Sequence, residues 1–126
     1  MKWNGSMGWA EDVIKIDDRD VEIFYMPASR STNTTAAEKF FNSLDFPDIV
    51  KKAKDFAIKH ALEGAEEWCD LPLSEIKEKL STIKVNGITV YKTSVDFYFN
   101  DAGIYGEHTF VISYDKNGKF DFLLEG

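Results

Sequence analysis

Residues 93–125 read TSVDFYFNDAGIYGEHTFVISYDKNGKFDFLLE, and this stretch decides the fold. Apolar and polar residues alternate in three runs, which is the pattern of strands that are buried on one side. The runs predict strands at 94–100, 107–114 and 119–125. Because each follows the last after a short polar connection, we expect them to form a three-stranded antiparallel meander.

The second turn of the meander fixes the pairing of its last two strands. Asp115 suits the first position of a type I turn, and Gly118 accepts the positive φ of the bulge that follows. This turn places Tyr114 opposite Phe120. The pairs that follow from it are Ile112 with Phe122, Phe110 with Leu124, Ser113 with Asp121, Val111 with Leu123 and Thr109 with Glu125.

The first turn predicts the same two faces. A loop at 101–106 sets Phe99 opposite His108, and then Phe97 opposite Phe110 and Val95 opposite Ile112. A slip of one residue would invert a whole strand, so the agreement between the two registers favours the meander. The inner face then holds Val95, Phe97, Phe99, His108, Phe110, Ile112, Tyr114, Phe120, Phe122 and Leu124.

The N-terminal part of the chain predicts a hairpin after a loose lead-in. The first eight residues contain small and polar types with no regular period. Alternating runs at 12–16 and 20–26 then flank the polar turn 17–19, which is typical of a hairpin.

Helical signals fill the middle of the chain. Thr35 and Glu38 have the spacing of a capping box. A long amphipathic helix is expected from Pro47 to Cys69, and Ser74 can begin a short third helix.

The strand signals resume after the third helix. The pair Asn86-Gly87 predicts a hairpin between 83–85 and 88–91. The apolar phase slips near 92–94, which we interpret as a β-bulge. The fold class expected is α+β, an antiparallel sheet made of the N-terminal hairpin plus the C-terminal meander, with two or three helices packed on one face.

Composition limits the classes of function. The length of 126 residues predicts a single domain, 1–126. The net charge of −7 argues against binding to nucleic acid or to an anionic membrane. Cys69 is the only cysteine, which excludes an internal disulfide and a cysteine-based zinc site. With no apolar signal core or membrane-length segment, we expect a cytoplasmic protein. No metal and no cofactor are expected, because the sequence has no His-x-x-x-His or Cys-x-x-Cys pair, no phosphate loop and no dinucleotide glycine pattern.

Two histidines are the candidates for chemistry. His60 lies on the apolar side of the long helix, and His108 lies near the end of a strand on the aromatic face. The interpretation favoured for both is a structural role, with a general base or ligand in a helix–sheet pocket as the functional alternative. Cys69 is expected to be a buried, inert thiol.

The outer face of the meander is the candidate binding surface. It has an apolar and aromatic centre and an acidic rim, which suits a basic partner, although a plain solvated sheet face has the same alternation. The partner-binding residues predicted are Asp96, Tyr98, Val111, Asp121, Leu123 and Glu125.

The segments 96–101, 106–110 and 114–119, DFYFND, GEHTF and YDKNGK, resemble the small acidic α+β immunity proteins of bacterial contact-dependent growth inhibition and polymorphic toxin systems. The resemblance covers the C-terminal third of the chain. It implies a non-enzymatic protein that binds and blocks one cognate toxin, often a nuclease, and it carries over no catalytic residue. The oligomeric state stays open.

Two other functions are compatible with the sequence. One is a small-molecule-binding or enzymatic domain that uses His60 or His108 in a pocket between helix and sheet. The other is a subunit of a homo-oligomer whose outer sheet face pairs with itself. A hollow where a histidine and carboxylates converge would favour the first, and a flat acidic face would favour the inhibitor.

Overall fold

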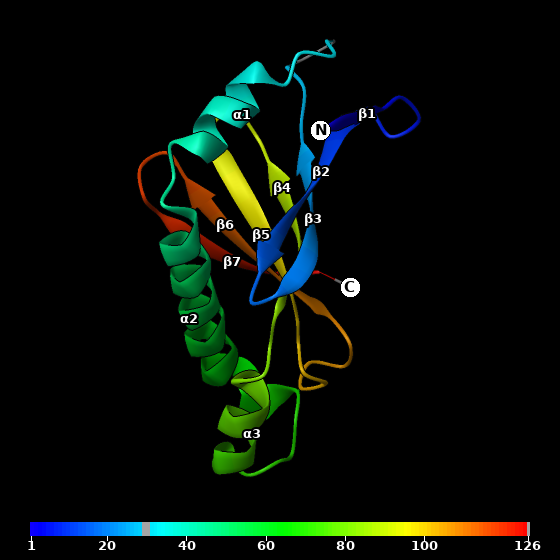
Figure 1. Ribbon diagram of the computed structural model, residues 1–126. Helices are drawn as coiled ribbons and strands as arrows, with labels where there is room; N and C mark the ends of the chain where they lie inside the picture. Colours follow the sequence, from blue (N-terminus) through cyan, green and yellow to red (C-terminus); the bar gives the residue numbers. More distant parts are fainter. Residues whose placement is uncertain (29–30, 126) are drawn as a thin grey trace.

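The computed structural model describes residues 1–28 and 31–125. Within these residues, seven strands form one mostly antiparallel sheet and three helices cover one of its faces, so the fold is α+β (Figure 1). The elements are β1 (Lys2–Asn4), β2 (Trp9–Ile16), β3 (Arg19–Tyr25), α1 (Thr35–Asn42), α2 (Phe46–Gly64), a 3-10 turn (Ala65–Glu67), α3 (Leu73–Leu80), β4 (Val85–Val90), β5 (Ser94–Asn100), β6 (Thr109–Asp115) and β7 (Phe120–Glu125).

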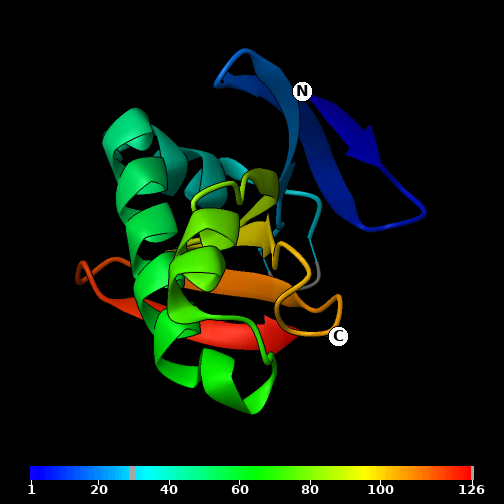
Figure 2. The ribbon, with the colours of Figure 1, turned by 90° about the horizontal axis from the view of Figure 1, so that it is seen from below.

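The expected hairpin and meander are therefore parts of one larger sheet. Its strand order, β1 to β7, follows the chain. Among the strands of the described residues, β3 and β4 alone pair in parallel, with Glu22 opposite Gly87 and Tyr25 opposite Val90. Parallel neighbours need a long crossover. The helical segment between β3 and β4 supplies it and lies on one face, as Figure 2 shows from below.

The N-terminal hairpin is confirmed, and its turn explains why it forms. Asp17 and Asp18 have φ of 50° and 62°, as the two central residues of a type I′ turn require. The loose lead-in was the wrong prediction for residues 2–4, because β1 pairs with β2 and places Lys2 opposite Glu11.

The hairpin predicted at Asn86-Gly87 is wrong. Both residues lie inside β4, and neither has the positive φ that a type I′ turn needs. The register against β5 shifts there instead, between Val85 and Gly87. The chain reverses at 91–93, where the Tyr91 N–H donates to the Ser94 carbonyl at 2.8 Å. This reversal, and not a bulge at 92–94, accounts for the slip in the apolar phase.

The meander has the predicted faces with one corrected register. All six predicted pairs between β6 and β7 are present. Between β5 and β6, Phe99 pairs with Phe110 and Phe97 with Ile112, a shift of two residues that keeps the faces unchanged. The shift arises because β6 begins at Thr109, which leaves His108 in the loop.

The expected helices are present with different ends. The first is capped by Thr34 instead of Thr35, and the Thr34 hydroxyl lies 2.9 Å from a Glu38 oxygen. The long helix ends at Gly64, before the predicted Cys69, and the third begins before the predicted Ser74. Ser29 and Arg30, in the polar segment before α1, lie outside the described residues.

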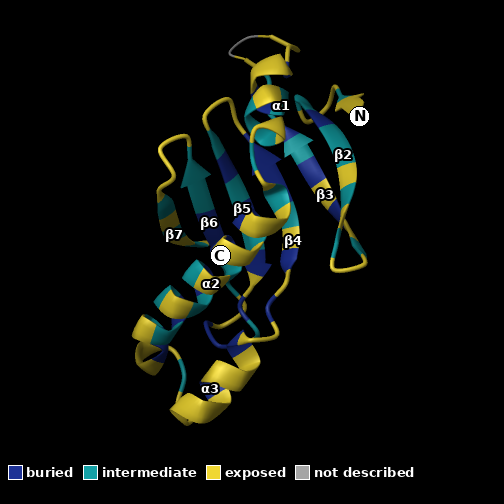
Figure 3. Cartoon of the chain, turned by 60° about the vertical axis from the view of Figure 1, so that its left-hand side comes forward, coloured by how far each residue is buried: buried dark blue, intermediate teal, exposed yellow. Residues whose placement is uncertain are grey.

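Small residues let α2 approach the sheet closely. Ala53, Ala57 and Ala61 are fully buried against the aromatic inner face. On the strands, Phe97, Phe99 and Phe110 are at most 1% exposed. Burial falls off toward β7, where the inner residues are only half-buried (Figure 3). The core is therefore centred beneath β4, β5 and β6.

Candidate functional site

The outer face of β5, β6 and β7 carries the predicted binding residues in ordered rows. Tyr98, Val111 and Leu123 lie opposite one another across the three strands. The neighbouring row holds Asp96 and Asp121 on either side of Ser113, and the row beyond Tyr98 ends at Glu125. The helices pack on the opposite face. The structure thus brings all six predicted residues onto one surface.

Their exposure differs in a way that the alternation alone did not predict. Leu123 is 60% exposed, whereas Val111, in the middle strand, is 3% exposed. Asp121 and Glu125 are exposed, and Tyr98 is half-buried. Val111 therefore offers almost no contact area of its own.

The ring of Tyr98 lies over Gly87 of the adjacent strand. A Cβ placed on Gly87 would lie 4.0 Å from Cδ2 of Tyr98. The Tyr98 hydroxyl lies 3.4 Å from Oγ1 of Thr89, also on β4. Burial raises the pKa of Tyr98, so this phenol stays neutral at ordinary pH. Gly87 and Thr89 of β4 therefore flank the ring at the centre of the face.

Asp96 is a half-buried carboxylate beside this ring. Burial raises its pKa, and a hydrogen bond from Ser113 opposes the rise. The nearby Tyr91, 37% exposed, also has a raised pKa, first because of burial and then because of the charges of Asp96, Tyr98 and Glu125. The pKa values of Tyr91, Asp96 and Tyr98 are therefore all raised in this part of the face.

The acidic surface extends onto the N-terminal strands. Glu22 lies opposite Gly87, which pairs with Tyr98, so Glu22 continues the central row. A shallow hollow of about 350 Å³ beside it is lined by Met1, Lys2, Glu11, Asp12, Val13, Glu22 and Phe24. Hydrogen bonds from Trp9 and Asn4 lower the pKa of Glu11. Sequence reasoning missed this extension, because only the parallel β3–β4 pairing joins the two halves of the face.

The two histidines take part in packing. The ring of His60 stacks on Phe122, with centroids 5.8 Å apart, and lies 4.3 Å from that of Phe56. His108 has Nδ1 at 2.6 Å from the Tyr105 carbonyl oxygen and its ring edge-on to Trp68. Among the residues that the structure describes, no three His, Cys, Asp or Glu side chains are grouped to hold a metal ion. Cys69 is half-buried, not buried as predicted.

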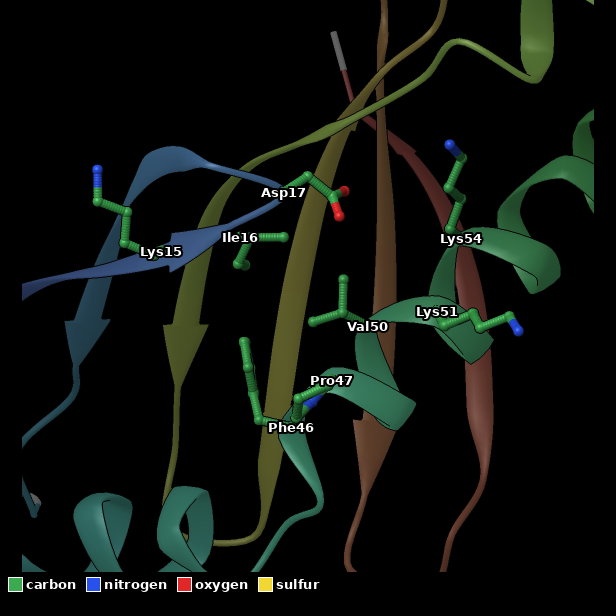
Figure 4. Close-up of a pocket in the computed structure, with 8 residues that line it drawn as sticks. All are labelled: Lys15, Ile16, Asp17, Phe46, Pro47, Val50, Lys51 and Lys54. Atoms are coloured by element: carbon green, nitrogen blue, oxygen red, sulfur yellow. The ribbon is translucent and has the colours of Figure 1, made fainter.

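A hollow of about 470 Å³ separates the β2–β3 turn from the start of α2 (Figure 4). Ile16, Phe46 and Val50 point into it. The ammonium groups of Lys15 and Lys51 point away from it, and that of Lys15 pairs with Asp20 at 3.0 Å. Neither histidine lines this hollow, the one beside Glu22, or the hollows that adjoin α3 and α1. The charged residues that line the hollow of Figure 4, Lys15, Asp17, Lys51 and Lys54, thus have no histidine among them.

No family model, curated protein or solved structure matches this chain. Within residues 1–28 and 31–125, none of the helices combines the length and the apolar character needed to cross a membrane.

Proposed function

We propose that this protein is a non-enzymatic inhibitor that binds a basic bacterial toxin in the cytoplasm through the outer face of β5, β6 and β7. The observation that carries the proposal is the arrangement of this face. Tyr98 and Leu123 form an apolar centre, and Asp96, Asp121 and Glu125 surround it with carboxylates. A face of this kind suits a flat, basic protein surface.

The contributions of the two kinds of residue are distinct. Acidic side chains and the net charge of −7 attract a basic partner over a distance and raise the rate of association. Apolar contacts at the centre, once desolvated, slow dissociation. Because Tyr98 is already half-buried beside β4, part of its side-chain freedom is lost before a partner covers it.

The identity of the partner class rests on the resemblance to immunity proteins. That resemblance implies a cognate toxin, and a nuclease is the activity that fits the charge best. A nuclease must hold phosphates and is therefore basic. An acidic face can occupy the same surface that would hold the nucleic acid.

The structure gives less support to the two alternatives. A pocket enzyme needs polar groups that converge, and neither His60 nor His108 lines any of the four hollows. A homo-oligomer that pairs its outer faces would bring Asp96, Asp121 and Glu125 of one copy against the same residues of the other. Like charges that meet in this way cost free energy.

We expect the cognate toxin to be encoded by the gene beside that of this protein, and inhibition of that toxin tests the proposal. Purified protein is titrated into the toxin, and residual toxin activity is measured. We expect one-to-one loss of activity, which Asp121→Lys with Glu125→Lys weakens. The matched control is Glu75→Lys with Glu78→Lys, which makes the same change in charge on exposed residues of α3.

Equal weakening by both double variants would assign the effect to net charge and not to the outer face. Full toxin activity at every concentration of the protein would contradict the proposal.

A further inference from the structure

The strand β7 ends the sheet and leaves one of its edges open. In the described part of the chain, β7 pairs with β6 alone, on one side. The turn shows which backbone groups face the open side. The Asp115 N–H donates a 3.0 Å hydrogen bond to the Lys119 carbonyl, so these two residues form a hydrogen-bonded pair. From there, hydrogen-bonded and non-hydrogen-bonded pairs alternate along the two antiparallel strands. The N–H and C=O groups of Phe120, Phe122 and Leu124 therefore point away from β6.

The apolar core is incomplete at this edge. The inner residues of β5 are at most 1% exposed, and Phe110 and Ile112 of β6 are fully buried. On β7, the inner residues Phe120, Phe122 and Leu124 are only half-buried, although α2 lies over the two phenylalanines. Phe56 stacks on Phe120 with centroids 5.5 Å apart, and His60 stacks on Phe122. A further strand beside β7 would complete the burial of these rings.

The other side of the same strand is acidic. Asp121 and Glu125 are exposed, with the 60% exposed Leu123 between them. Lys119 reaches Asp121 only at 3.9 Å, and both side chains are 69% exposed, so this pair neutralises little. An added strand would meet apolar groups on its helix side and carboxylates on its outer side.

We propose that the basic partner adds an antiparallel strand to β7, with apolar residues toward α2 and basic residues opposite Asp121 and Glu125. This inference rests on the proposed function, because the strand belongs to the same partner. Main-chain hydrogen bonds to Phe122 and Leu124 supply affinity, and the alternating side chains supply specificity. The strand continues the sheet, so its outer residues also extend the face that holds Tyr98.

A second copy of this chain is disfavoured at the edge in the register that would pair the acidic residues of β7. Antiparallel self-pairing centred on Leu123 sets Asp121 of each copy opposite Glu125 of the other. Like charges directly opposite one another destabilise a strand pair. Charged residues on an edge strand are a common protection against such pairing, and here they leave the edge available to a basic strand.

Amide hydrogen exchange with a synthetic peptide, acetyl-Lys-Val-Leu-Val-Lys-Val-amide, tests the proposal. In the antiparallel pairing its lysines lie opposite Glu125 and Asp121, and its valine N–H groups point to β7. We expect exchange of the Phe122 and Leu124 amides to slow by roughly tenfold when the peptide is present at ten times its Kd. The same peptide N-methylated on its valines should give no protection, whereas N-methylation on its lysines should preserve it.

The charge requirement is tested with Asp121→Lys and Glu125→Lys together. This variant should bind the peptide roughly tenfold more weakly, since two cross-strand pairs become repulsive. Antiparallel strand addition would be overturned if the unmodified, valine-methylated and lysine-methylated peptides all bound equally. It would also be overturned if the lysine-methylated peptide alone failed to protect the two amides. No protection by any peptide would also overturn it.

The complex with the neighbouring toxin separates this inference from the proposed function. A tight complex in which Phe122 and Leu124 exchange as in the free protein would overturn strand addition alone. If the peptide protects the two amides as expected but the protein does not bind the toxin, strand addition at β7 would be supported and the toxin would be excluded as the partner.

Discussion

Ser113 donates a hydrogen bond of 2.5 Å to Oδ1 of Asp96 across the paired strands β5 and β6. The bond holds a half-buried carboxylate beside the ring of Tyr98. Burial raises the pKa of Asp96 more than this bond lowers it, so the ionised form is disfavoured in the folded protein. The acidic face therefore includes one carboxylate whose charge is opposed by its surroundings.

The raised pKa of Asp96 predicts how stability depends on pH. In the range just above the ordinary value of 3.8, the folded state binds more protons at Asp96 than the unfolded state. Stability from this group therefore falls as pH rises through the folded pKa. Asp96→Asn, which cannot ionise, should gain stability relative to the unaltered protein as the pH rises above 3.8, the ordinary pKa of the group.

Urea unfolding across this pH range measures the difference. Ser113→Ala should extend the pH-dependent loss to higher pH, because it removes the bond that lowers the pKa of Asp96. Parallel pH profiles for Asp96→Asn and the unaltered protein would show that Asp96 has no raised pKa.

Gly118 has the positive φ, 81°, that the turn chemistry predicted. A Cβ at this position would lie 3.7 Å from the Tyr114 hydroxyl, which is an ordinary contact, so the cost of a side chain lies in the backbone. Gly118→Ala should lower the free energy of unfolding by roughly 1 kcal/mol. The control is Gly5→Ala, at an exposed residue without positive φ, which should change it by less than about 0.5 kcal/mol. Equal effects in urea unfolding would contradict the explanation.

Asp101 organises the loop before β6. Its carboxylate is 5% exposed and accepts hydrogen bonds from the backbone N–H groups of Gly103, Tyr105 and His108, at 2.8, 3.1 and 3.0 Å. Asp101→Ala should cost about 1–3 kcal/mol, because the buried Tyr105 N–H is left without an acceptor. Asp101→Asn keeps one acceptor oxygen and should cost less. Calorimetric melting of both variants checks this order, and an unchanged Tm in the alanine variant would contradict it.

Tyr98 is predicted to control dissociation from the partner. Tyr98→Ala removes the ring at the centre of the face, and a loss of about 2 kcal/mol or more in binding is expected mainly as a faster off-rate. Tyr98→Phe keeps the ring and loses only the 3.4 Å contact with Thr89, so it should bind nearly as the unaltered protein does. Binding kinetics with the neighbouring toxin distinguish the two variants. An unchanged off-rate in Tyr98→Ala would place the centre of the interface elsewhere.

Local chemistry explains which parts of the fold were predictable. The β6–β7 register follows from Asp115 and Gly118, because a tight turn fixes its own pairing. The β5–β6 register cannot be derived from a tight turn in the same way. The loop between these strands is longer, and three hydrogen bonds from backbone N–H groups to the Asp101 carboxylate hold it in place. Asn86-Gly87 has the residues of a tight turn, but pairing with β3 and β5 keeps it extended. Contacts distant in sequence override the local preference there.

The sequence was enough to predict which residues lie on the candidate face, but not how exposed each of them is. Alternation placed Tyr98 and Leu123 on one side, since side chains in a strand alternate between faces. Burial of Val111 depends on neighbours in two other strands. The extension to Glu22 depends on a parallel pairing across more than half the chain, for which the sequence has no local signal.

The central claim is that the outer face of β5, β6 and β7 attracts a basic protein. Association with the product of the neighbouring toxin gene, measured by surface-binding kinetics over a salt series, tests it most directly. The on-rate of the unaltered protein should fall steeply as salt rises past about 0.15 M, where the screening length is roughly 8 Å. Asp121→Lys with Glu125→Lys should slow association and flatten the salt dependence, while Glu75→Lys with Glu78→Lys, which changes the net charge equally but away from this face, should affect both less. An on-rate that is the same in the first double variant as in the unaltered protein, at every salt concentration, would contradict the claim.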